Sequence, residues 1–157
     1  MDKKEIKIIK DITKKLLEML DVDGDFEILE MQNGKGEKSV EIVLNTKDTG
    51  VVIGYHGDTL EGLQLVLSLC VARKLGRFVR ISIDAGDYKK NRTDWLKTLA
   101  LETKERVLAD GKEAVIPELK SWERRVVHLL LEGDEEVISE SQGEGRDRVL
   151  VVKPKSK

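Results

Sequence analysis

Apolar residues at the start of the chain recur every three or four positions, with lysines largely between them. The apolar positions are Ile6, Ile9, Ile12, Leu16, Met19 and Leu20, and the lysines are Lys3, Lys7, Lys10 and Lys14. This period predicts an amphipathic helix that ends near residues 21–24. Such a helix could lie on a membrane surface. Because loop residues follow at once and no bulky aromatic residue anchors the apolar face, we expect it to pack on a sheet instead.

Alternating patterns downstream predict strands. Residues 26–31 and 39–44 have strand character, and the second segment alternates strictly, with apolar residues at Val40, Ile42 and Leu44. The turn-forming sequence Asn33-Gly34-Lys35-Gly36 lies between the two segments and predicts an antiparallel hairpin. A third strand is predicted over residues 77–83.

Helical patterns fill the interval between the second and third strands. Residues 46–53 predict a short helix, and residues 58–75 predict a longer one that Gly76 ends. Asp58 and Glu61 have the spacing of a capping box, with Asp58 as the N-cap. The apolar stripe of the longer helix comprises Leu60, Leu63, Leu67, Cys70 and Val71. Cys70 is therefore expected to be a small buried residue rather than a nucleophile.

The second half of the chain predicts a further mixture of helices and strands. It comprises a helix over about 87–110, a strand over 114–118, a helix over 121–131 that Ser121 caps, and a hairpin of strands 136–141 and 148–152. The short segment Asp84–Asp87 is the best boundary between the halves. The predicted fold class is α+β, with two small α/β sandwich domains. Residues 1–84 have the order α-β-β-α-α-β, and residues 85–157 have the order α-β-α-β-β.

A Gly-x-x-Gly step, Gly54-Tyr55-His56-Gly57, joins two of the predicted helices. Glycine allows positive φ and close approach of another backbone, and the following helix directs N–H groups and the positive end of its dipole at the loop. A phosphate could therefore sit there. A plain helix–turn–helix connection with a glycine cap is the alternative, and only the rest of the chain can decide between the two.

A second candidate site lies on the predicted helix 121–131. Arg124 and His128 are four residues apart, so both are expected on one face, with Arg125 beside them. The opposite side is expected to hold Trp122, Val126, Leu129 and Leu130. Arg and His both bind phosphate, and four more basic residues fall on neighbouring predicted elements: Lys89, Lys90, Arg92 and Arg148. A solvated helix face is the alternative to a phosphate-binding patch.

Composition narrows the class of protein. The 157 residues are 39% hydrophobic and 37% charged with two prolines, which is typical of a folded globular protein. Because 28 Lys and Arg balance 30 Asp and Glu, any attraction for nucleic acid must come from local clusters. Seven basic residues lie between Arg73 and Arg92, against Asp84 and Asp87.

Other classes of function are disfavoured. One cysteine and two histidines give neither a disulfide nor a zinc spacing, so we expect no metal and no cofactor, and a reducing, cytoplasmic location. No apolar run is long enough to span a membrane, and the amphipathic N-terminus is unlike a signal peptide. No nucleophile lies at a plausible spacing from His128, and no Walker-type loop is present. We therefore expect a protein that is not an enzyme.

The two motifs together resemble the bacterial Jag family, also called SpoIIIJ-associated protein or KhpB/EloR. The residues that carry the resemblance are 52–64, the segment Glu123-Arg124-Arg125-Val126-Val127-His128 and Ser139-Glu140-Ser141, with Tyr88–Arg92 as a basic segment between them. That family joins a type II KH domain to a domain named for its Arg-x-x-x-His motif. Longer members carry a further N-terminal domain and linker, which this chain is expected to lack.

The resemblance implies a regulator that binds single-stranded RNA, with single-stranded DNA as the alternative. Its implied roles are in cell elongation, division or sporulation. A protein-interaction adaptor that pairs with a small KH protein or with itself is the second hypothesis. Family members usually have Lys or Arg between the two glycines, whereas Tyr55 and His56 stand here. We therefore expect the C-terminal half to supply more of the phosphate affinity than the glycine loop does.

Overall fold

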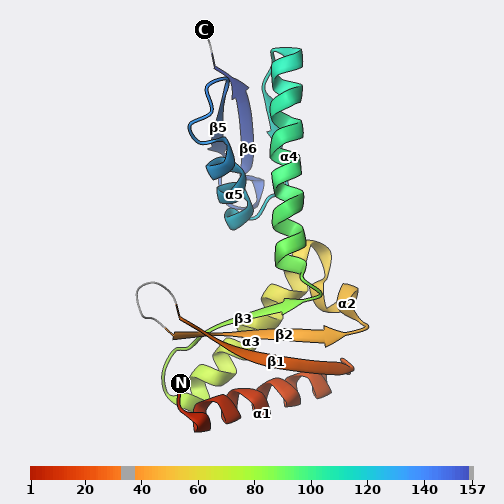
Figure 1. Ribbon diagram of the computed structural model, residues 1–157, viewed down its shortest axis with the longest axis vertical. Coiled ribbons are helices and arrows are strands. Elements are labelled where there is room, and N and C mark those ends of the chain that lie inside the picture. The colour runs from red at the N-terminus through yellow and green to blue at the C-terminus, as the bar shows by residue number, and fades with distance from the viewer. Residues whose placement is uncertain (33–37, 156–157) are drawn as a thin grey trace. The chain divides into compact units, whose positions relative to one another are not determined.

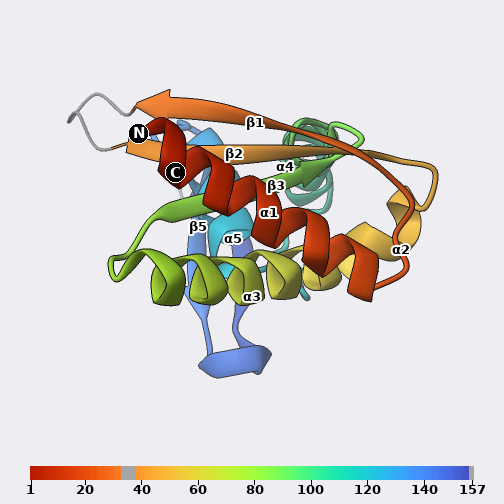
Figure 2. The same ribbon diagram turned by 90° about the horizontal axis from the view of Figure 1, so that it is seen from below.

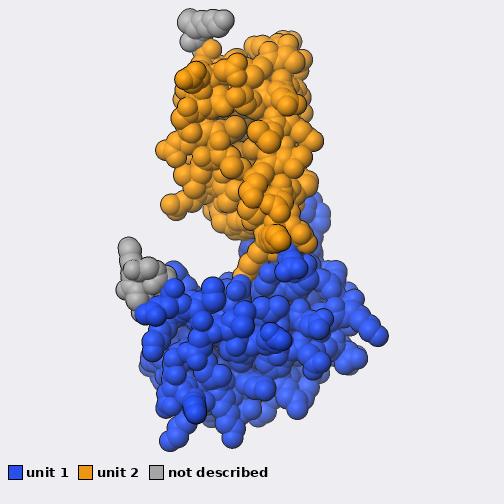
Figure 3. All heavy atoms as spheres, in the orientation of Figure 1, with its two compact units in different colours: residues 1–88 blue, residues 89–157 orange. Residues whose placement is uncertain are grey.

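The computed structural model describes residues 1–32 and 38–155. Contacts between Cα atoms divide the chain into two compact units, Met1–Tyr88 and Lys89–Lys157, which Figure 3 colours separately. That residues 1–84 and 85–157 are independent domains stays a prediction.

Unit 1 is a three-stranded sheet with helices on one face. Its elements, in chain order, are α1 (Lys3–Met19), β1 (Gly24–Gln32), β2 (Lys38–Thr46), α2 (Thr49–Ile53), a 3-10 turn (Tyr55–Gly57), α3 (Asp58–Leu75) and β3 (Arg80–Ala85). The sheet order is β1-β2-β3, with β1 antiparallel and β3 parallel to β2. Helices α1 and α3 lie side by side on the same face of the sheet (Figures 1 and 2). The predicted order α-β-β-α-α-β is therefore correct.

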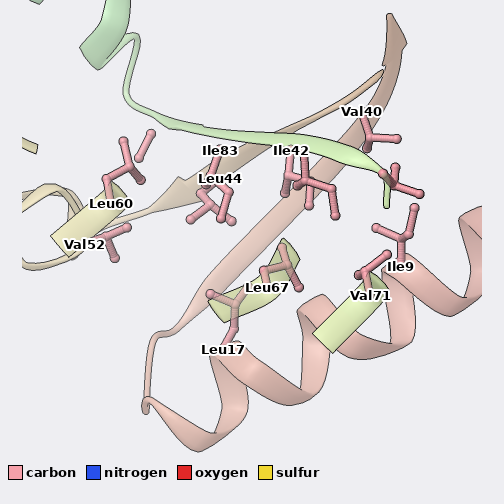
Figure 4. Packing of buried hydrophobic residues seen from close by; sticks show 13 residues of the cluster. Ile9, Leu17, Val40, Ile42, Leu44, Val52, Leu60, Leu67, Val71 and Ile83 are labelled. Carbon is pink, nitrogen blue, oxygen red and sulfur yellow. The ribbon is translucent and has the colours of Figure 1, made fainter. Parts of the chain in front are cut away.

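The core of unit 1 follows from the alternation in the two parallel strands. Val40 of β2 pairs with Ile81 of β3, and Ile42 pairs with Ile83, so their side chains share one face of the sheet. Figure 4 shows the α3 side chains of this core beneath the strands and near those of α1. The buried apolar residues of these two helices are Ile9 and Leu17 from α1 and Leu60, Leu67 and Val71 from α3.

Several local predictions for unit 1 are wrong. Helix α3 begins with Asp58 itself, after Gly57 at the N-cap, so Asp58 is not the capping residue. Cys70 is exposed, because the buried stripe of α3 passes through Leu67 and Val71 and leaves Cys70 on the solvent side. The first helix after β2 starts at Thr49 rather than 46 because β2 continues to Thr46. The turn predicted at 33–36 lies outside the described residues.

Unit 2 packs two helices on a second three-stranded sheet. Its elements are α4 (Tyr88–Asp110, whose first residue belongs to unit 1), β4 (Ala114–Ile116), α5 (Ser121–Leu131), β5 (Val137–Gln142), a 3-10 turn (Gly145–Asp147) and β6 (Val149–Pro154). The sheet order is β4-β6-β5 with both pairings antiparallel. The buried core includes Leu96, Ala100 and Val107 of α4, Val127 and Leu131 of α5, and Leu150 and Val152 of β6. Both units mix helices and strands as the α+β class predicts.

Candidate nucleic-acid interface

The Gly-x-x-Gly step is a tight left-handed loop between α2 and α3. Gly54 has φ 68°, His56 has φ 49° and Gly57 has φ 82°. Three of the four residues therefore lie in the region that glycine adopts most easily. The chain reverses within this loop and enters the 18-residue helix α3 directly.

Both glycines are also required by the space around them. A Cβ on Gly54 would lie 2.0 Å from Oγ1 of Thr59, and a Cβ on Gly57 would lie 2.8 Å from Cε1 of Tyr88. Real Cβ atoms do not approach other atoms so closely. The side chains of Thr59 and Tyr88 thus occupy the space next to the two glycines, where a Cβ would lie. Gly57 itself is buried.

The two residues between the glycines form the outer surface of the loop. Tyr55 is 68% exposed, and its ring stacks on that of His56 with 4.1 Å between centroids and 11° between planes. Asp58 and Glu61 occupy the first turn of α3 and are exposed. These two carboxylates therefore lie close to the positive end of the α3 dipole. The loop itself contains neither Lys nor Arg.

Arg124 does not share an exposed face with His128. Its side chain is buried, and its guanidinium donates to the carbonyl oxygens of Leu119 and Arg148 and, over 3.1 Å, to Oγ of Ser121. The buried face of α5 holds Glu123, Arg124, Val127 and Leu131. The side predicted to lie opposite the two motif residues is substantially exposed at Trp122, Leu129 and Leu130. The guanidinium of Arg124 therefore donates its hydrogen bonds within the protein rather than to a phosphate.

His128 is exposed, and one nitrogen of its ring has a protein partner. Its Nδ1 lies 2.8 Å from Oγ of Ser139 on β5, a residue that is itself buried. This contact fixes the ring orientation and leaves Nε2 as the nitrogen that an outside group could meet. Arg125, next to the buried Arg124, is exposed.

Arg92 is also committed inside unit 2. Its Nε donates to Glu123 over 2.6 Å, and the two side chains are 11% and 0% exposed. Its guanidinium stacks over the ring of Trp95 at 4.1 Å. Glu123 additionally accepts the backbone N–H of Lys120 at the start of α5, over 2.8 Å. This buried ion pair fastens the start of α4 to the start of α5.

The remaining predicted cations differ in exposure. Lys90 and Arg148 are exposed, whereas Lys89 is half-buried. Of the basic residues predicted for this patch, those with exposed side chains are thus Lys90, Arg125, His128 and Arg148.

Sequence reasoning missed Glu123 as the partner of Arg92 and Ser139 as the partner of His128. Glu123 accepts the backbone N–H of Lys120, but Lys120 is not a capping residue type, so the sequence did not mark this contact. Nothing in the sequence marked the pairing of Ser139 with His128, since they are brought together only when β5 packs beside α5.

Among residues 1–32 and 38–155, no group of three or more His, Cys, Asp or Glu side chains could hold a metal ion. Within the same residues, no helix is both long and apolar enough to cross a membrane.

Comparison with known proteins gives matches to both units. Residues 7–83 match the family "KhpA/KhpB, KH domain", and residues 94–154 match the domain family named for its Arg-x-x-x-His motif. The chain is similar to proteins named RNA-binding protein KhpB, with 28% identity over 124 residues in Clostridium symbiosum and 28% over 123 residues in Bacillus subtilis. A third such protein, from Streptococcus pneumoniae (strain D39), is 29% identical over 122 residues.

The matches cover most of this chain but only part of each relative. They span 79%, 77% and 78% of the chain, and 56%, 59% and 37% of the relatives from C. symbiosum, B. subtilis and S. pneumoniae. A KhpA/KhpB-type KH domain and an Arg-x-x-x-His domain follow one another in the same order as the two motifs read from the sequence. The chain therefore belongs to the Jag family, also called KhpB.

Proposed function

We propose that this protein binds single-stranded RNA, with the Gly54–Gly57 loop against the sugar–phosphate backbone. The observation that carries the proposal is the loop itself. Two left-handed glycines, packed against Thr59 and Tyr88, present Tyr55 and His56 to solvent at the start of α3. A loop of this kind clamps about four nucleotides in KH domains. The names of the similar proteins agree with RNA as the ligand.

The Arg-x-x-x-His domain adds phosphate contacts in this proposal. Lys90, Arg125, His128 and Arg148 supply them, since their side chains are exposed. Arg92 and Arg124 do not contact RNA in this proposal. Their buried interactions position α5, the helix that carries Arg125 and His128. Four nucleotides give little affinity alone, and a covalently joined second domain raises the effective concentration of its own contact to roughly the millimolar range.

Replacement of Tyr55 and His56 together tests the KH contact. Tyr55→Asp with His56→Asp places two carboxylates where phosphate would lie, and Asp tolerates the left-handed conformation at position 56. We expect the affinity for a single-stranded RNA, measured by fluorescence anisotropy, to fall by at least tenfold, about 1.4 kcal/mol. Gly57→Asp is unsuitable because its Cβ would collide with Tyr88.

A matched variant separates charge from loss of the rings. Tyr55→Ser with His56→Ser removes both side chains without adding charge, and should weaken binding less than the Asp pair. Equal RNA affinity in the wild type and the Asp variant, with the fold intact by circular dichroism, would refute the loop contact.

Arg125→Ala tests the contact of the second domain. Loss of one phosphate contact should reduce the slope of log affinity against log salt by about 0.7 for a single strand. Arg106→Ala is the control, since Arg106 is an exposed arginine of α4 outside the proposed patch. If both variants keep the wild-type slope, Arg125 does not bind RNA.

Association with a second KH protein or with another copy is a second candidate function. It is favoured by an apolar strip on the solvent side of α3, where Leu65 and Leu69 are each 62% exposed and Val66 is 46% exposed. Next to Val66, an apolar groove of about 420 Å³ lies between α1, α2 and α3. Light scattering at several concentrations, with and without ribonuclease, tests this. A nuclease-resistant oligomer that Val66→Glu dissociates supports direct association, whereas a nuclease-sensitive one indicates RNA bridging.

The proposal extends to the cell by family resemblance. We place the protein in the cytoplasm, with a role in cell elongation, division or sporulation and no enzymatic activity. Crosslinking in cells followed by sequencing of the attached RNA would identify the targets. The Tyr55→Asp, His56→Asp variant is the control, because transcripts that it recovers equally well do not depend on the loop.

A further inference from the structure

Helix α3 has opposite charge patterns at its two ends. Residues 48–72, which include the glycine loop, contain the acids Asp48, Asp58 and Glu61 and no Lys or Arg. Residues 73–83 contain the bases Arg73, Lys74, Arg77 and Arg80 and no acid. A cluster of cations that could attract an anionic polymer therefore gathers at the far end of α3 from the glycine loop.

We define the basic end as Arg73, Lys74, Arg77, Phe78 and Arg80. The first two lie in the last turn of α3, Gly76 ends the helix in the left-handed conformation, and Arg80 opens β3. All five side chains are exposed, and Phe78 is 75% exposed. The chain thus places an aromatic ring in solvent between arginines.

The architecture of unit 1 explains only part of this arrangement. Arg73 and Lys74 complement the negative end of the α3 dipole. Arg77 forms an ion pair with Glu5 of α1 over 2.6 Å, and its side chain stays 52% exposed. Within residues 1–32 and 38–155, no ion pair engages Arg73, Lys74 or Arg80.

Phe78 is left unexplained by packing. Its neighbour Val79 is 3% exposed and supplies the inward-facing apolar group at this point of the chain. Burial of a Phe side chain contributes about 1.5–3 kcal/mol, and the fold makes little use of it at this position. An exposed aromatic ring close in the chain to exposed arginines is the combination that binds single-stranded nucleic acid, by base stacking and phosphate contact.

We propose that the basic end is a second RNA contact of the KH domain, at which Phe78 stacks on a base while Arg73, Lys74 and Arg80 meet phosphates. This inference rests on the proposed RNA-binding function. The helical residues 58–72 separate the basic end from the glycine loop, and the rise along α3 from Gly57 to Arg73 is about 24 Å. The contact therefore requires an RNA longer than the four or so nucleotides that the loop clamps.

The test compares short and long RNA in the full chain. We use single-stranded RNAs of roughly 4 and roughly 16 nucleotides and measure affinity by fluorescence anisotropy. Phe78→Ala should weaken binding of the long RNA by roughly 5-fold to 150-fold and leave the short one unchanged. Phe78→Tyr keeps the ring and should restore most of the affinity.

The charge contribution is measured separately. Arg73→Ala with Arg80→Ala should lower the salt slope for the long RNA by about 1.4. Lys10→Ala with Lys15→Ala removes two exposed lysines of α1 and is the matched control. Because every substituted side chain is exposed, the variants should fold, which their circular dichroism checks.

Three outcomes would overturn the inference. If the wild type binds neither RNA, the proposed function fails, and this inference fails with it. If the Tyr55→Asp, His56→Asp variant loses binding while the basic-end variants match the wild type on long RNA, the proposed function stands and the basic end is not a contact. If Phe78→Ala abolishes sedimentation with phosphatidylserine vesicles but not RNA binding, the surface serves lipid instead.

Discussion

The buried ion pair between Arg92 and Glu123 gives the sharpest prediction of stability. Glu123 is fully buried, accepts Nε of Arg92 over 2.6 Å, and also accepts the backbone N–H of Lys120 over 2.8 Å. Glu123→Ala would leave the guanidinium of Arg92, whose side chain is only 11% exposed, without its counter-charge. It would also remove a hydrogen-bond acceptor at the start of α5.

The expected cost is large for one substitution. Removal of one partner of a buried pair costs about 3–5 kcal/mol, and loss of an N-terminal cap adds about 1 kcal/mol. The larger share comes from the uncompensated charge rather than from the lost attraction. Arg92→Leu with Glu123→Leu removes both charges and should therefore be less destabilising than Glu123→Ala alone.

Intrinsic fluorescence gives an assay specific to unit 2. The two tryptophans of the chain, Trp95 and Trp122, both lie in residues 89–157, so a urea titration followed by their emission measures the unfolding of this unit. Glu105→Ala, at an exposed carboxylate of α4, is the control and should change the free energy of unfolding by less than about 0.5 kcal/mol. If Glu123→Ala lowers the free energy of unfolding by less than about 1 kcal/mol, the guanidinium of Arg92 becomes hydrated when its partner is lost. The reasoning from burial would then be refuted.

Three further predictions concern the loop, the core and the response to acid. Gly57→Ala should destabilise unit 1 by about 1–3 kcal/mol, since φ is 82° and the new Cβ would meet Tyr88; an unchanged unfolding curve by circular dichroism would contradict this. Ile42→Ala should cost about 2–5 kcal/mol because Ile42 is fully buried, again by circular dichroism, and a cost below about 1 kcal/mol would mean that the core closes around the cavity. The hydrogen bond from Lys104 lowers the pKa of Asp134 from 3.8 to about 2, so its stabilisation is complete above about pH 4 and is lost as the pH falls toward 2. Asp134→Asn should reduce the loss of stability over that acid range, and an identical acid profile by tryptophan emission would contradict the assignment.

Helix α5 shows why its orientation could not be predicted from periodicity. At about 3.6 residues per turn its apolar residues form one wide arc that runs from Leu129 and Trp122 to Leu131, and the repeat does not say which part of that arc is buried. The face that is buried carries Glu123 and Arg124, whose charges are satisfied by Arg92 and by the carbonyls of Leu119 and Arg148. Those partners lie outside the helix, and the charged face can be buried only because folding brings them into contact with it.

The glycine loop shows the opposite case. The sequence by itself placed Gly54 and Gly57 at a helix junction, because the positions of glycine and the flanking helical patterns are local properties of the chain. That Thr59 and Tyr88 occupy the space of the missing Cβ atoms depends on how the chain returns to the loop, and a repeat pattern contains no such information.

The sequence alone therefore determined the order of helices and strands, the α+β class and the two motifs, since periodicity and turn chemistry act over a few residues. The tertiary structure decided which cations are free. The sequence predicts Arg92 and Arg124 as ligands for phosphate. Burial of either without a partner would be too costly, and each is held by groups that folding brings to it. Arg73, Arg80 and Phe78, by contrast, stay exposed at the far end of α3 from the glycine loop. Charge is a property of the residue, but its availability is a property of the fold.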